Sequence, residues 1–116
     1  MVDKLLFDKV KLLAHLDNDI ILAEQLMILY LQQLGQILLS MKEAVDSEDK
    51  RLVSALAHKI KGSSVSICCQ LISQKAVQIE EHLIGGHFNV SFIKNMINQI
   101  QDDATQFSLL LNPSDE

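Results

Sequence analysis

The stretch Ala57-His58-Lys59-Ile60-Lys61-Gly62-Ser63-Ser64, near the middle of the chain, organises the rest of the sequence. On a helix with about 100° per residue, the side chain of His58 points away from the apolar face and toward solvent. It shares its face with Arg51, Ser54, Lys61, Gly62 and Val65, whereas Leu52, Val53, Leu56, Ile60, Ser63 and Ile67 lie on the other face. The sequence therefore predicts an exposed histidine on an amphipathic helix.

A glycine inside this helix calls for an explanation, because glycine costs about 0.5 to 1 kcal/mol relative to alanine in a helix interior. Lys61 and Gly62 follow His58 at the two spacings at which helix side chains meet. The lysine supplies a cation, and the bare backbone of the glycine leaves room for an approaching partner. We therefore expect a functional site centred on His58.

The segment from His58 to Ser64 resembles the H-x-[LI]-K-G-[SA]-[SA] signature of histidine-containing phosphotransfer (HPt) domains. Such domains pass a phosphoryl group between receiver domains in multistep phosphorelays. The resemblance extends more weakly to Asp49, to the acidic Glu80 and to a helical layout over most of the chain. One departure is Cys68, which stands where the family usually has glycine, so the resemblance leaves open how the histidine's helix ends.

The resemblance implies a role for each site residue. His58 would accept the phosphoryl group on Nε2, Lys61 would neutralise phosphoryl oxygens, and Gly62 would admit the receiver's active site. Glu80 would accept a hydrogen bond from Nδ1–H of His58 and so leave Nε2 free. An antiparallel hairpin that turns near residues 68 and 69 would bring this carboxylate level with the histidine. The residues expected to contact the partner are Arg51, Ser54, Lys59 and Val65.

Response-regulator receiver domains and a hybrid sensor histidine kinase are the partners that the resemblance implies. No cofactor is expected on this chain, because the receiver domain would supply its aspartate pocket and a bound Mg²⁺. No GxxxxGK[ST] loop is present, so the chain is not expected to phosphorylate itself from ATP. We expect a monomer, because one free apolar face is reserved for a transient partner.

Composition favours one compact domain over residues 1–116. Hydrophobic residues make up 48% of the chain, with a single proline and no tryptophan, which favours a helical core over disorder. The net charge of −5 argues against nucleic acid as a partner, although a cationic patch surrounds His58. The apolar runs are too short to span a bilayer. With no secretory signal and with the adjacent Cys68 and Cys69 interpreted as reduced thiols, we expect a soluble cytoplasmic protein.

Apolar spacing predicts an all-α fold, an antiparallel up-down four-helix bundle with an additional short N-terminal helix. The short helix is expected over residues 3–15. The bundle helices are expected at about 19–46, 49–67, 69–84 and 90–111, so that the core bundle covers about 19–111. The predicted helix boundaries are a turn and cap at Asp17-Asn18-Asp19, a cap at Ser47 or Asp49, a left-handed ending at Gly85-Gly86 and a stop at Asn112-Pro113.

Each bundle helix has a predicted core stripe. The long first helix is expected to bury Leu22, Leu26, Leu29, Tyr30, Ile37, Leu38, Met41 and Val45. The helix after the histidine is expected to bury Ile72, Ala76, Ile79 and Leu83, and the last one Ile93, Met96, Ile97, Ile100, Ala104, Phe107 and Leu111.

Other interpretations of the site residues stay open. His58 can be an ordinary surface histidine, and Glu80 an ordinary carboxylate at a helix border. Ser63 and Ser64 are expected to let helices approach closely rather than to bind phosphate.

Two further functions compete with phosphotransfer. One is a helical bundle that docks on a receiver or a kinase without transferring phosphate, which burial of His58 would favour. The other is a metal- or haem-binding bundle, which needs two or more ligands converging in the core. The outward position of His58 argues against it, and no metal site is expected, because His15, His82 and His87 lack a ligand spacing such as H-x₃-H.

Overall fold

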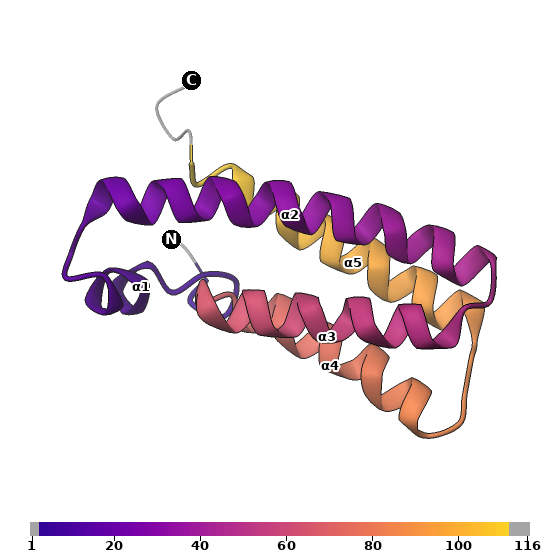
Figure 1. Ribbon diagram of the computed structural model, residues 1–116. Coiled ribbons are helices and arrows are strands. Elements are labelled where there is room, and N and C mark those ends of the chain that lie inside the picture. The colour runs from indigo at the N-terminus through magenta and orange to yellow at the C-terminus, as the bar shows by residue number, and fades with distance from the viewer. Residues whose placement is uncertain (1–2, 112–116) are drawn as a thin grey trace.

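In a computed structural model that describes residues 3–111, the chain folds into five α-helices and, within that range, no strand. The short α1 (Lys9–His15) precedes four helices that run alternately up and down (Figure 1): α2 (Ile20–Asp46), α3 (Lys50–Ser66), α4 (Gln70–Ile84) and α5 (Val90–Ser108). Helix α3 packs against α2 and α4, and α5 closes the bundle by packing against the same two helices. The predicted four-helix bundle with a short N-terminal helix is confirmed.

Aspartate side chains cap the N-termini of α2 and α3. The Oδ1 atom of Asp19 accepts a hydrogen bond from the backbone N–H of Leu22 at 3.0 Å, and Asp49 caps α3 in the same way. Each cap satisfies a backbone N–H group that has no partner within the helix. Of the two candidates for α3, Asp49 is therefore the cap, and Ser47 instead donates its hydroxyl to carbonyls at the end of α2.

The same backbone motif ends α2, α3 and α4. A residue with left-handed backbone follows each cap, namely Glu48 (φ 54°), Cys68 (φ 65°) and Gly86 (φ 85°). The next N–H donates back into the helix, from Asp49 to Ala44, from Cys69 to Ser64 and from His87 to His82. Gly86 fits as predicted. Cys68 ends α3 where glycine would, at a steric cost of about 1 kcal/mol because it carries a Cβ atom.

The core joins the four long helices to the N-terminal segment. Phe107 of α5 lies at its centre, with its ring edge-on to Phe7 at 4.8 Å and to Tyr30 at 5.7 Å between centroids. The stripe predicted for α4 is buried at Ile72, Ala76 and Ile79, and only half-buried at Leu83. That predicted for α5 is buried except at Ala104 and Leu111, which are half-buried.

Three leucines that were assigned to apolar faces are exposed instead. Leu22 is 38% exposed, Leu29 is 48% exposed and Leu52 is 42% exposed. The apolar residues of α2 are distributed over most of its circumference, so their spacing does not determine which side of the helix packs against the core. Within the bundle helices, the buried positions that were not predicted are Ala23, Met27, Leu34 and Ala44 on α2, Ala57 and Ser64 on α3, and Ser73 on α4.

The N-terminal segment covers the end of the bundle where α3 turns into α4 (Figure 1). The backbone N–H of Asp8 donates to the carbonyl of Cys68 at 3.0 Å, and that of Leu71 donates to the carbonyl of Leu5 at 2.6 Å. The predicted helix over residues 3–15 is therefore wrong in its first part, which is a turn, and α1 begins only at Lys9. The predicted stop at Asn112-Pro113 lies outside the described residues. Within residues 3–111 no helix has both the length and the hydropathy needed to cross a bilayer.

Candidate functional site

His58 lies near the middle of α3 with its side chain in solvent. The helix buries Val53, Ala57 and Ile60 against the core, so its opposite side is free. The side chain of His58 is 68% exposed. This exposure is what the sequence predicts, and it makes the imidazole accessible to another molecule.

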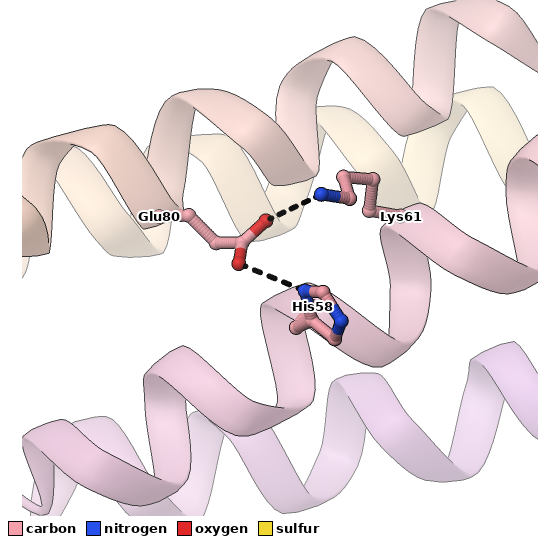
Figure 2. A network of polar contacts seen from close by, with 3 residues as sticks. All are labelled: His58, Lys61 and Glu80. Atoms are coloured by element: carbon pink, nitrogen blue, oxygen red, sulfur yellow. Dashed lines mark hydrogen bonds and ion pairs between the residues drawn. The ribbon is translucent and has the colours of Figure 1, made fainter.

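Glu80 of α4 contacts the imidazole. Its Oε2 atom lies 3.2 Å from Nδ1 of His58, as Figure 2 shows. A carboxylate oxygen can accept a hydrogen bond from the ring when the ring proton is on Nδ1, and in that tautomer the lone pair on Nε2 is free. The Glu80 side chain is itself only 16% exposed, which restricts its motion. The antiparallel hairpin thus brings together the two side chains that the sequence paired, and the ring keeps one free nitrogen.

Lys61 stands on the other side of the same carboxylate (Figure 2). Its Nζ atom is 3.9 Å from Oε1 of Glu80. That distance is too long for a hydrogen bond, and the lysine side chain is 38% exposed, so the attraction is weak and screened by solvent. Little free energy is therefore needed to redirect the ammonium group toward an anion beside His58.

Gly62 has open space where a side chain would be. A Cβ atom built there would meet nothing within 4 Å. Packing inside this chain therefore does not require glycine, although glycine destabilises a helix.

The other predicted contact residues surround the histidine on α3. Arg51, Lys59 and Val65 are exposed, and Ser54 is half-buried. On the side of α3 that faces α2, a shallow groove runs between the two helices. It is lined by Leu26, Leu29, Tyr30 and Gln33 of α2 and by Ser63, Ser66 and Ile67 at the end of α3.

This groove was not predicted from the sequence, because Leu29 was expected to be buried in the core. A signal was available, since Leu29 lies about 100° around α2 from the tyrosine that follows it, and both cannot point to the centre of the bundle.

The two serines of the motif make contacts within the chain. Ser64 is buried, and its Oγ lies 2.7 Å from the hydroxyl of Tyr30, while Ser63 donates to backbone carbonyls of its own helix. Burial raises the pKa of the Tyr30 hydroxyl, and it raises the pKa of the Cys69 thiol to about 12. Both groups are therefore neutral at physiological pH, and the Tyr30–Ser64 hydrogen bond ties α2 to α3.

Two of the histidines away from the site, His82 and His87, lie at the turn between α4 and α5, whereas His15 is the last residue of α1. Nε2 of His82 accepts a hydrogen bond from the backbone N–H of Asn89 at 2.9 Å, and its ring stacks on that of His87. Desolvation, and secondarily the charge of His87, lower the pKa of His82. Within residues 3–111 no group of three or more His, Cys, Asp or Glu side chains could hold a metal ion, and Cys68 and Cys69 are free thiols.

Comparison with known protein families adds an independent finding. The family model of the Hpt domain matches residues 25–106 of this chain. This range begins within α2, ends within α5 and includes His58 and Glu80. No curated protein and no solved structure matches the chain.

Proposed function

The chain belongs to the Hpt domain family, which performs histidine phosphotransfer in phosphorelays, and we propose that His58 is its phosphoacceptor. The observation that supports this role is the hydrogen bond between Nδ1 of His58 and Glu80 at 3.2 Å, on an otherwise exposed ring. The proposed partners are receiver domains of response regulators, with a hybrid sensor histidine kinase upstream, in the cytoplasm.

In the proposed step, Nε2 of His58 attacks the phosphorus of an aspartyl phosphate on the receiver. A P–N bond forms, the P–O bond to the aspartate breaks, and the aspartate leaves as a carboxylate. Because the proton stays on Nδ1, the phosphorylated ring is cationic, and Glu80 stabilises it. The reverse step delivers the phosphoryl group to the aspartate of a second receiver.

This chain holds the nucleophilic imidazole of His58 in position and supplies no acid or base catalyst. The receiver supplies the aspartate pocket and a Mg²⁺ ion that neutralises phosphoryl oxygens. Lys61 adds a second cation, and Gly62 lets the receiver approach. Arg51, Ser54, Lys59 and Val65 surround the histidine as docking residues, and the exposed Leu29 extends this surface into the groove between α2 and α3.

Transfer from a receiver domain charged on its aspartate tests the proposal. We expect wild-type protein to take up label that is lost in acid and kept in base, and His58→Gln to take up none while its circular dichroism spectrum is unchanged. Labelling of His58→Gln would refute the assignment. A wild-type protein that binds the receiver without being labelled would instead be a docking module that does not transfer phosphate.

A further inference from the structure

Helix α2 has a second exposed apolar face, turned away from the proposed phosphotransfer site. Ile28 is 48% exposed and Leu39 is 62% exposed. Ile28 lies roughly 160° around the helix from Tyr30, whose hydroxyl meets Ser64 of α3. In Figure 1, α2 forms one outer edge of the bundle along its whole length. The face therefore lies on the opposite side of α2 from the groove beside α3.

This face is also free of charge. From Gln25 to Met41 the sequence contains no Asp, Glu, Lys, Arg or His, although the chain as a whole carries a net charge of −5. Glu24 and Lys42 bracket the uncharged stretch. The exposed residues beside Ile28 and Leu39 are Gln25, Gln32, Gly35, Gln36 and Ser40.

We propose that this face of α2 binds the same face of a second copy of the chain, with the two helices antiparallel. A two-fold interface must be complementary to itself. Glutamine satisfies this requirement, because its amide both donates and accepts hydrogen bonds. Two molecules of the same net charge also repel least where the surface between them carries no charge.

The spacing of the residues along α2 fits one antiparallel register. With the two-fold axis beside the peptide bond between Gln33 and Leu34, Ile28 lies opposite Leu39 of the second copy. Gln32 then lies opposite Gly35, where an added Cβ would meet nothing in its own chain, so there is room for the amide. At each end, Glu24 of one copy lies level with Glu43 of the other and one residue from Lys42, so charged side chains of both signs occur only at the rim.

This arrangement departs from the monomer expected from the sequence, which assumed a single free apolar face. It does not depend on the proposed phosphotransfer, because the paired faces lie away from α3 and His58 stays exposed in both copies. The contact is limited to one pair of helices, so we expect a dissociation constant on the order of micromolar.

Sedimentation velocity over a concentration series tests the proposal. Wild type should approach twice the 13.0 kDa mass of one chain as concentration rises. Ile28→Glu alone and Leu39→Lys alone should each remain monomeric, because each places two unpaired charges in the interface. An equimolar mixture of these two variants should form a heterodimer, since the register sets the introduced carboxylate opposite the introduced ammonium group.

Ile84→Glu is the matched control, because Ile84 is 81% exposed but lies on α4; this variant should dimerise like wild type. A wild type that is monomeric throughout, or an Ile28→Glu variant that still dimerises, would overturn the proposal. A mixture that stays monomeric would overturn the antiparallel register. Because Ile28→Glu should still accept label and His58→Gln should still dimerise, failure of either proposal can be recognised separately.

Discussion

The substitution Gly62→Ala adds one methyl group a single turn from His58, at a position where nothing lies within 4 Å of the new atom. Alanine is more favourable than glycine in a helix interior by about 0.5 to 1 kcal/mol. Dividing this gain by the unfolding entropy typical of a domain of this length gives a rise in Tm of about 2 to 4 °C. Thermal unfolding followed by circular dichroism would measure it.

The same methyl group should slow phosphotransfer. It projects from the face by which the receiver must reach Nε2 of His58, and transfer requires the reacting atoms to approach to about 3 to 3.5 Å. We expect the initial rate of labelling by a phosphorylated receiver to fall by about tenfold or more, as measured by rapid quench. A more stable protein would then be a poorer phosphoacceptor.

Gly35→Ala is the matched control for this experiment. Gly35 also lies inside a helix with no atom within 4 Å of an added Cβ, but on α2 and away from His58. At concentrations where the chain is monomeric, so that the proposed α2 interface plays no part, it should stabilise the fold by a similar amount and leave the labelling rate unchanged. Labelling of Gly62→Ala at the wild-type rate would refute the idea that the glycine provides clearance for a partner.

Three further predictions follow from other contacts. Glu80→Gln keeps a hydrogen-bond acceptor but removes the charge, so we expect the phosphorylated protein to lose its label several-fold faster, a change of about 1 kcal/mol; an unchanged lifetime would mean that Glu80 does not stabilise the phosphorylated ring. Cys68→Gly removes the steric cost of the left-handed cysteine but also its buried side chain, so it should change the free energy of unfolding in urea little, whereas Cys68→Val should lower it by about 2 kcal/mol, because a β-branched residue fits poorly at a positive φ; equal effects would contradict the left-handed ending of α3. His82 has a lowered pKa in the folded state, so the unfolded chain binds more protons and stability should fall as the pH drops from about 7 to 5. Urea unfolding should show a weaker pH dependence in His82→Gln, and an identical one would exclude His82 as a cause.

The sequence was sufficient to predict the helices and the site because both depend on local signals. Asp19 and Asp49 are strong caps, and Gly86 favours a left-handed ending, so most helix boundaries agree with the structure within a few residues. The partnership of His58 and Glu80 follows from the length of two helices and the short turn between them. A family signature on one face of α3 was enough to place the candidate site.

The sequence failed where the outcome depends on the rest of the fold. Leu22 and Leu29 belong to a helix that is apolar on most sides, and only the positions of α3 and α5 decide which leucines are covered. The burial of Phe7 depends on Phe107, which lies at the far end of the chain. The ending at Cys68 was also unpredictable, because the cost of a left-handed cysteine is small beside the packing energy of the helices it joins.

The turn between α3 and α4 sets a constraint on how this domain can change in evolution. Glu80 directly follows Ile79, which is wholly buried, so the rotation of α4 about its own axis sets both the core contact of Ile79 and the contact of Glu80 with His58. Inserting one residue between Ser66 and Gln70 would rotate α4 by about 100° relative to α3. Because Ile79 and Glu80 belong to the same helix, this rotation would move Ile79 out of the core and turn Glu80 away from His58 at the same time. The length of this turn is therefore constrained both by the packing of α4 in the core and by the contact between Glu80 and His58.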